Sequence, residues 1–315
     1  MKAIQLLARF TAVCTVIFSA AAASSTNVTI GQWDFDSKDL RPTIGQPLQY
    51  LGGATTSNDT TFVTATIGGN TAHVMGFPAA APEQGYIVTH GAQPNGGGTN
   101  VNEYTLIMDI MFPAESDGSW RSILQTGNNA PDDDAEIFVN PLNRVGFGSD
   151  FFGELPPEQW SRLAITVDVT NNLASYYIDG AAVGSENLNT EVDGHWSLGP
   201  TFLLFTDNNF DTAPGFVNSV QFRSEVLSAD AIAALGGATA GGIGTTNAPV
   251  GFTLAISKSQ GAAKITVTSP GTYQLQTATN IAAPVWLNVG TPVNGTSFDV
   301  ATTNKKSFYR AQKIQ

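Results

Sequence analysis

The clearest hydrophobic pattern in the chain is an alternation across Leu163–Val169. Leucine, isoleucine and valine occupy every second position there, with small or polar residues between them, which predicts a strand with one buried face. A second β-rich run, Leu173–Ile178, is separated from Ala181–Gly184 by Asp179-Gly180. Asp-Gly favours a two-residue hairpin because both central positions of a type I′ turn need a positive φ. The sequence therefore predicts a three-stranded antiparallel meander.

Short β-rich runs with Gly, Asn, Asp and Pro between them continue along the chain, and helical periodicity is nearly absent. One short helix is predicted, because Ser228 is placed as its N-cap, Ile232 and Leu235 share one face, and Gly236 ends it. About ten strands followed by one helix indicate an all-β, antiparallel jelly-roll or similar β-sandwich. The other strands predicted in this region are Thr29–Asp34, Thr61–Ile67, Tyr104–Met111, Arg121–Leu124, Glu136–Val139, Thr201–Phe205 and Phe216–Arg223.

A glycine-rich, uncharged segment, residues 238–249, follows the predicted helix. Such a composition predicts a flexible linker. Residues 250–315 then contain further short β-rich runs, which predicts a small, separate C-terminal β-module. The predicted strands of this module are Phe252–Ile256, Lys264–Thr268, Thr272–Gln276, Val285–Val289, Thr296–Val300 and Ser307–Ala311.

The N-terminal residues predict export. Lys2 and Arg9 precede an apolar stretch, Phe10–Phe18, and small residues follow it as far as Ala23. This order is typical of a secretory signal peptide, and the stretch is shorter than the roughly 20 residues of a membrane-spanning helix. We expect residues 1–23 to be removed, so that the mature chain is secreted or held at the cell surface without a transmembrane segment. A retained membrane anchor is the alternative.

The net charge limits the classes of partner that the chain can bind, and the cysteine content excludes an intramolecular disulfide. The chain has 14 basic and 26 acidic side chains, a net charge of −12, and losing Lys2 and Arg9 with the signal peptide would make it −14. An acidic surface disfavours nucleic acid and anionic membranes as partners. The one cysteine, Cys14, cannot form an intramolecular disulfide. Because it lies in the predicted signal peptide, we expect a cysteine-free mature protein.

Five motifs are distinctive: Tyr104-Thr105-Leu106, Trp160–Ala164, Tyr177–Gly180, Val217–Phe222 and Leu227–Gly236. Together they resemble the laminin-G-like, concanavalin A-like jelly-roll family. The resemblance implies a jelly-roll domain over residues 24–237, in a fold that hosts lectins, adhesion modules, glycanases and lyases.

The C-terminal residues carry a second, smaller resemblance. The segments Tyr273–Gln276, Trp286 and Phe308–Arg310 are similar to a short β-module found at the ends of exported bacterial surface proteins. This similarity implies little about a ligand.

The sequence disfavours several kinds of catalysis. It contains no nucleophile elbow and no phosphate-binding loop, and its three histidines lack the spacing of metal ligands. Jelly-roll glucanases carry Glu-x-Asp and a second Glu two or three residues further on. Here Glu115-Ser116-Asp117 and Glu191-Val192-Asp193 lack that second Glu. We therefore expect a non-catalytic binding protein.

Two alternatives remain open. One is a carbohydrate-active enzyme of the same fold, a glycoside hydrolase or lyase, in which the fold brings together carboxylates such as Glu136 and Asp109. Glycoside cleavage needs two carboxylates facing one bond. The other is a structural or adhesion protein of the cell surface that binds other proteins through both modules.

Two acidic loops are candidate metal sites. The first contains Asp132, Asp133 and Asp134, and the second contains Asp207 and Asp211. Oxygen-rich loops suit a hard cation such as calcium, and the resemblance allows calcium at a loop rim. The alternative is that these Asn and Asp residues only form turns that cap their own backbone.

Aromatic residues are the candidate sugar contacts. Trp120 and Trp196 follow predicted turns, and Phe151 and Phe152 are adjacent. Two adjacent residues of a strand face opposite sides, so one of these phenylalanines should be exposed. With Asn208 as a hydrogen-bonding group, we expect these residues to bind a glycan or another component of the cell surface or matrix.

Overall fold

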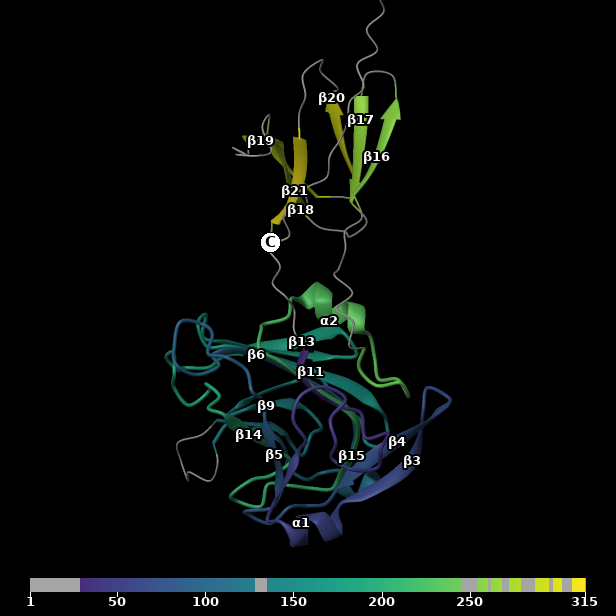
Figure 1. The fold of residues 1–315 in the computed structure, drawn as a ribbon, viewed down its shortest axis with the longest axis vertical. Helices are drawn as coiled ribbons and strands as arrows, with labels where there is room; N and C mark the ends of the chain where they lie inside the picture. The colour runs from purple at the N-terminus through teal and green to yellow at the C-terminus, as the bar shows by residue number, and fades with distance from the viewer. Residues whose placement is uncertain are drawn as a thin grey trace, which may run out of the picture. The chain divides into compact units, whose positions relative to one another are not determined.

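The structure is a computed structural model that describes residues 29–127 and 135–244, followed by the strand segments 254–259, 262–267, 272–278, 287–294, 297–301 and 308–314. The chain divides into two compact units, one spanning residues 26–247 and the other including residues 248–315 (Figure 1). The predicted signal peptide and the loop 128–134 lie outside the described residues.

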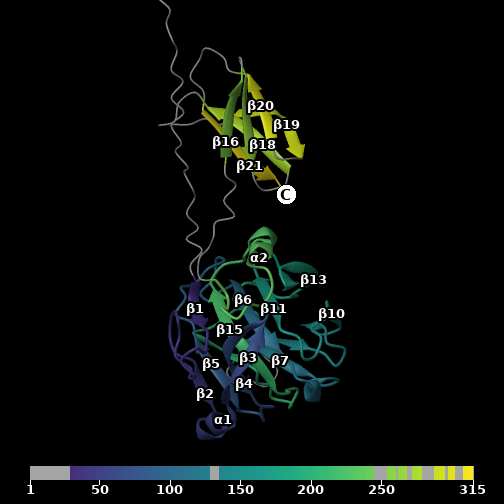
Figure 2. The ribbon, with the colours of Figure 1, turned by 90° about the vertical axis from the view of Figure 1, so that its right-hand side faces the viewer.

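The first unit is a sandwich of two antiparallel sheets (Figure 2). The larger sheet has the order β13 (Ala181–Asn187), β12 (Leu173–Ile178), β11 (Ser161–Asp168), β6 (Glu103–Met111), β15 (Gly215–Arg223), β4 (Asn70–Phe77) and β3 (Thr61–Ile67), and β1 (Thr29–Trp33) also pairs with β15. The smaller sheet has the order β10 (Asp150–Phe152), β9 (Val145–Phe147), β8 (Glu136–Val139), β7 (Arg121–Gln125), β14 (Thr201–Leu204), β5 (Gly85–Thr89) and β2 (Gln49–Leu51). The predicted antiparallel sandwich and the β11–β12–β13 meander are confirmed.

The inner faces of the two sheets form one hydrophobic core. Leu163, Ile165 and Val167, the alternating residues of β11, are each 0% exposed in this core. The intervening Ala164 is also buried, because it packs beneath Ile232 on the other side of the sheet. The alternation predicted one buried face, whereas β11 is buried on both.

The helix α2 (Ala229–Leu235) covers that second face of the larger sheet. The Ala231 N–H donates to Ser228 Oγ at 3.2 Å, and Gly236 ends the helix with φ 62°. The predicted cap, buried face and C-terminal glycine are all confirmed.

The glycine-rich residues after α2 continue across the same face. Arg162 binds both oxygens of Asp109 and donates to the carbonyls of Leu235 and Gly242. The other contacts of this segment are Gln32 Nε2 to Ile243 O at 2.8 Å, Asn218 Nδ2 to Thr239 O at 2.8 Å, and Gln221 Nε2 to Gly244 O at 3.3 Å. We call residues 236–244 the strap. Composition predicted a flexible linker from residue 238, but buried polar side chains of the sheet fix the strap in place, and residues 245–249 lie outside the described residues.

Several elements were not predicted: the helix α1 (Ala54–Asp59), the 3₁₀ turn at Ala114–Ser116, and the strands β2, β4, β5, β9 and β10. Strands β2, β9 and β10 have three residues each, too few to show a period. None of the helices in the described residues is long and apolar enough to span a membrane.

The second unit contains two three-stranded antiparallel sheets. One has the order β16 (Leu254–Ser259), β17 (Ala262–Val267) and β20 (Ser297–Ala301), and the other has the order β19 (Leu287–Asn294), β18 (Thr272–Ala278) and β21 (Phe308–Ile314). Each predicted strand of this module overlaps one of these, so the small C-terminal β-module is confirmed.

Candidate ligand-binding site

Three aromatic side chains meet on the outer face of the smaller sheet. The Trp120 ring lies 5.9 Å from the Phe138 ring at 81° and 5.5 Å from the Phe151 ring at 64°, measured between centroids. Trp120 is 37% exposed, and both phenylalanines are half-buried. We call these three residues the aromatic cluster.

Strand register places the two phenylalanines side by side. Phe138 in β8 and Phe151 in β10 both pair with Gly146 in the intervening β9. A Cβ at Gly146 would lie 2.0 Å from the Asp150 carbonyl oxygen, so the close approach of β9 and β10 requires glycine. Because Ile137 belongs to the core, its neighbour Phe138 faces outward.

Phe138 was missed as a site residue, although the signal for it was present. In Glu136–Val139 the residues on either side of Phe138 are the most aliphatic, and both are buried in the core. The strand period of two therefore directs Phe138 to the opposite face.

The adjacent pair Phe151-Phe152 divides between two faces, as strand geometry requires. Phe151 belongs to the aromatic cluster, whereas Phe152 packs against the core and stacks on Tyr176 at 5.8 Å and 24°. The structure therefore places Phe151, and not Phe152, beside Trp120.

Trp196 departs from the prediction. It is 2% exposed, its ring lies 4.5 Å from that of Phe147, and its carbonyl accepts a hydrogen bond from Tyr104 Oη at 3.1 Å. A ring enclosed in the core has no free face for a sugar. The prediction was wrong because a preceding turn does not fix the direction in which the next side chain points.

The loop 207–212 is fastened to the strand that follows Trp120. The Ser122 N–H donates to Asp211 O at 2.9 Å, which holds this loop against β7. Asp207 is 1% exposed, and its Oδ2 accepts the N–H groups of Asn209 and Asp211, each at 2.7 Å. Asp207 thus caps its own loop, as the alternative to a metal role anticipated.

Asn208 and Phe210 are the remaining side chains of interest in this loop. The Asn208 Oδ1 atom is buried and has no hydrogen-bond partner, whereas Phe210 is 67% exposed. Burial raises the pKa of Asp211, and the neighbouring Asp207 adds to that rise.

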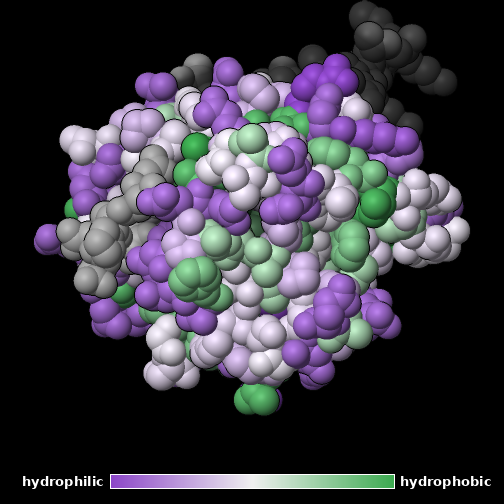
Figure 3. Space-filling view, turned by 90° about the horizontal axis from the view of Figure 1, so that it is seen from below, coloured by the Kyte–Doolittle hydropathy of each residue, from purple (hydrophilic) through white to green (hydrophobic). Residues whose placement is uncertain are grey.

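Exposed large hydrophobic residues are few in the described part of the chain. They are Val63, Trp120, Leu142, Leu173, Val192, Phe210 and Leu287. Leu142 lies in the β8–β9 turn, which Arg121 holds to the start of β7 by donating to Asn140 O at 2.6 Å. Figure 3 shows one face of the molecule, where hydrophobic residues form separate patches between hydrophilic ones.

The predicted calcium ligands are only partly described. Asp132, Asp133 and Asp134 lie outside the described residues. Within residues 29–127 and 135–244, no three His, Cys, Asp or Glu side chains gather as they would around a metal ion. Calcium at Asp207 and Asp211 remains a prediction.

The carboxylates of the enzyme alternative lie on different sheets. Asp109 is in β6 of the larger sheet, and Glu136 is in β8 of the smaller one. Asp109 is 0% exposed and pairs with Arg162 beneath the strap. Burial raises the Asp109 pKa, and Arg162 opposes that rise. The pair named for the enzyme alternative, Asp109 and Glu136, therefore does not meet in one cleft.

The buried histidine, His90, has a structural role. Its Nδ1 accepts the Ala92 N–H at 3.0 Å, so its Nε2 carries the proton and donates to Gly199 O. The ring lies 6.2 Å from Phe202 and 5.3 Å from Phe222. Burial lowers the His90 pKa, which favours the neutral ring.

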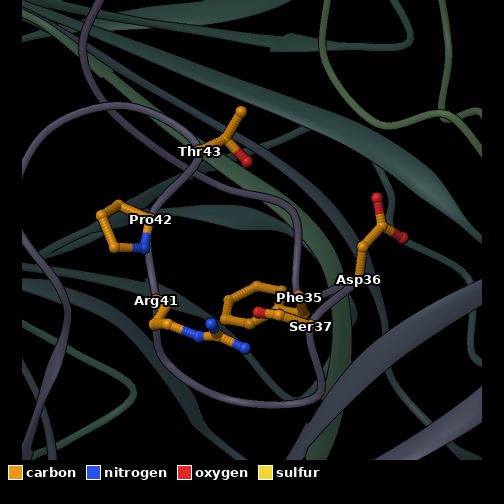
Figure 4. A pocket seen from close by; sticks show the side chains of 6 residues that line it. All are labelled: Phe35, Asp36, Ser37, Arg41, Pro42 and Thr43. Carbon is orange, nitrogen blue, oxygen red and sulfur yellow. The ribbon is translucent and has the colours of Figure 1, made fainter.

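A separate open hollow of about 250 Å³ lies on the loop after β1 (Figure 4). It is lined by Phe35, Asp36, Ser37, Arg41, Pro42 and Thr43. Arg41 is already bound to Asp39, at 2.6 Å from Nε to Oδ2. All the residues that line the hollow come from this one loop, so we assign the hollow no function.

Comparisons with known proteins agree with this fold. A family model described as the concanavalin A-like lectin/glucanases superfamily, of the laminin G type, matches residues 78–233, about half of the chain. No curated protein sequence matches the chain.

Solved structures with partial similarity include domain 4 of AbnA, a GH43 extracellular arabinanase from Geobacillus stearothermophilus, in complex with arabinotriose. It is 17% identical, the match covers 66% of this chain and 98% of that domain, and the TM-score is 0.45. The botulinum neurotoxin type G receptor binding domain is 14% identical over 66% of this chain and 50% of that one, with a TM-score of 0.44. The chain thus spans half the length of that toxin domain.

The matched region runs from just after β4 into α2 and includes most strands of both sheets. The β-sandwich domain of this chain therefore belongs to the concanavalin A-like lectin/glucanase superfamily.

Proposed function

We propose that the chain is a secreted, non-catalytic glycan-binding protein and that the aromatic cluster is its sugar-binding surface. The observation that carries this proposal is the partly exposed Trp120 ring, set edge-on against Phe138 and Phe151. Binding sites combine aromatic surfaces with a few convergent polar groups, and the apolar face of a sugar ring can pack on an aromatic ring.

The cluster is built to hold its shape. Two edge-to-face contacts brace the Trp120 side chain, and a side chain that is already ordered loses less conformational entropy when a ligand binds. Loop 207–212 is bonded to β7 through Ser122 and carries Asn208, which we propose as the polar contact through its side-chain amide. The combination of an aromatic surface and an amide group suits a ligand with both C–H faces and hydroxyl groups.

The aspartates of the two candidate hydrolase motifs have structural roles, which favours binding over cleavage. Asp117 accepts the Gly118 N–H and Asn143 Nδ2, each at 3.0 Å. Asp193 accepts the N–H groups of Thr99 and Asn100 at 2.7 and 2.9 Å. Asn102 Nδ2 also donates to Asp193 Oδ1 at 3.0 Å, and this bond, together with the two backbone bonds, holds the Asp193 pKa well below its usual range.

We further propose that calcium binds at Asp207 and Asp211, together with the acidic residues 132–134, and that the domain acts outside the cell after removal of residues 1–23. The first point is supported by the pKa of Asp211, which burial and then the neighbouring Asp207 raise, because a cation would relieve the repulsion between the two carboxylates. The charged, apolar and small-residue order of residues 1–23 supports the second. We propose that the partner of this extracellular domain is a glycan of the cell surface or matrix.

The decisive experiment is a glycan array with the mature chain, followed by calorimetry on the hits with two variants. Trp120→Ala should weaken binding at least tenfold, about 1.4 kcal/mol. Leu173→Ala is the matched control, because Leu173 is 41% exposed but lies in the larger sheet, and it should bind like the unmodified chain. Equal affinity of the two variants would contradict the proposal. Release of reducing sugar from the hits would favour the enzyme alternative.

A further inference from the structure

Most edge strands of the sandwich carry features that block pairing with another strand. Strands β2 and β10 have only three residues each. The register of β13 shifts opposite Tyr176 and Tyr177, and Gln32 of β1 bonds to Ile44 of the following loop. Short length, irregular register and a covering loop are ways in which proteins protect sheet edges.

The strand β3 has none of these features. Its seven residues, Thr61–Ile67, include no charged residue, proline or glycine, and it pairs with β4 without a register shift. In the described part of the chain, no strand pairs with its other side. Figure 1 shows the β3–β4 hairpin at the margin of the domain.

The turn of this hairpin determines which groups point outward. Gly68 and Gly69 have φ values of 56° and 81°, as a type I′ turn requires. In a two-residue hairpin the flanking pair, here Ile67 and Asn70, exchanges hydrogen bonds, and bonded positions then alternate along the strand. The backbone groups of Phe62, Thr64 and Thr66 therefore point away from β4.

We propose that β3 pairs antiparallel with β3 of a second copy of this chain, about a two-fold axis at Thr64, so that two larger sheets join into one. This register places Thr64 opposite its counterpart and Phe62 opposite Thr66 of the copy. Every outward backbone group of these residues then gains a partner, and the exposed Val63 meets Ala65 of the copy on the outer face. A self-complementary surface of this kind is what a two-fold interface needs.

The charge of this edge does not oppose a second copy. Two chains with a net charge of −12 repel each other, but β3 brings no carboxylates together. The nearest one in the sequence, Asp59, precedes the strand and would lie beyond the end of the copy's strand, near its Gly68-Gly69 turn. Because one strand pair is a small interface, we expect a weak, concentration-dependent dimer.

Sedimentation velocity of the mature chain over a range of concentrations tests the proposal, with variants at Thr64. The side chain is exposed, so these changes leave the core intact. In the symmetric register Thr64→Lys opposes lysine to lysine and Thr64→Asp opposes carboxylate to carboxylate, so each should raise the dimer dissociation constant at least tenfold. An equimolar mixture of the two variants should form the dimer again.

Thr71→Lys is the matched control. Thr71 is equally exposed but lies in β4, away from the free edge, and this variant should dimerise like the unmodified chain. A chain that stays monomeric at its highest soluble concentration would overturn the proposal. So would a dimer that both Thr64 variants leave unchanged, because its interface would lie elsewhere.

Discussion

Arg162 and Asp109 form a buried, bidentate ion pair between β11 and β6. The Arg162 Nε and Nη2 atoms lie 2.7 and 2.8 Å from the two Asp109 carboxylate oxygens, and both side chains are almost fully buried. The same guanidinium donates to carbonyls at the end of α2 and in the strap. One arginine therefore joins two strands, a helix and the strap.

Replacing Arg162 alone should be strongly destabilising. Arg162→Met leaves the Asp109 carboxylate buried without its partner, and breaking a buried pair in this way costs about 3–5 kcal/mol. The double variant Arg162→Met with Asp109→Leu removes both charges and should recover part of that loss. Urea unfolding measures the two free energies, and equal stability of the single and double variants would contradict this account.

A second prediction concerns Glu186 in β13, which lies against Tyr176. Tyr176 Oη donates to Glu186 Oε1 at 2.5 Å, and burial raises the pKa of Glu186 to about 7. An unfolded glutamate titrates near 4.3, so folding favours the protonated form. The stabilisation of the folded chain by protonated Glu186 is complete below about pH 4.3 and is lost as the pH rises through about 7.

Glu186→Gln should therefore unfold at a higher temperature than the unmodified chain at pH 8, by a few degrees, and at nearly the same temperature at pH 4. A glutamine can still accept the Tyr176 hydroxyl and carries no charge to desolvate. Glu154→Gln is the control, because Glu154 is exposed. An identical pH dependence for Glu186→Gln and the unmodified chain would show that Glu186 titrates normally.

From the contacts of His90 we predict that the folded chain loses stability at acidic pH. Its ring accepts from Ala92 and donates to Gly199 as the neutral form, and burial lowers its pKa. The neutral ring therefore contributes its full stability above the unfolded value of about 6.5. That contribution falls as the pH drops through the lower, folded pKa.

Thermal unfolding between pH 7 and pH 5 tests this prediction. His90→Phe, which keeps a ring between Phe202 and Phe222 but does not titrate, should reduce the decline in unfolding temperature. His195→Gln should leave the decline unchanged, since His195 is exposed. If the unfolding temperature of both variants declines as that of the unmodified chain does, a group other than His90 causes the loss of stability at acidic pH.

The sequence predicts strands well where local pattern and turn residues coincide. Thr61–Ile67, Glu136–Val139 and Leu173–Ile178 were predicted with the bounds that the structure shows, because β-rich runs end there at Gly, Asn or Asp. Long-range contacts account for the failure at the strap, where side chains such as Arg162 and Gln32, distant in sequence, bind its backbone.

The candidate site shows the same limit. Trp120 and Trp196 have the same local signal, an aromatic ring after a turn, yet one is 37% and the other 2% exposed. The difference comes from their partners: Phe138 and Phe151 on the outer face in one case, and Phe147 and the core in the other. A tryptophan's exposure depends on which sheet face it meets, and only the folded chain determines that.

Calcium should stabilise the folded chain through Asp207 and Asp211. A ligand that binds only the folded state stabilises it by about 2.7 kcal/mol at a concentration one hundred times its Kd. We therefore expect the unfolding temperature to rise in calcium and to fall again when a chelator is added. Asp211→Asn should abolish most of this shift, because it removes the carboxylate whose pKa Asp207 already raises. Asp36→Asn, in the exposed loop after β1, should retain the full shift. An unfolding temperature that is the same in saturating calcium and in chelator would rule the site out and leave Asp207 with only its role of capping the N–H groups of Asn209 and Asp211.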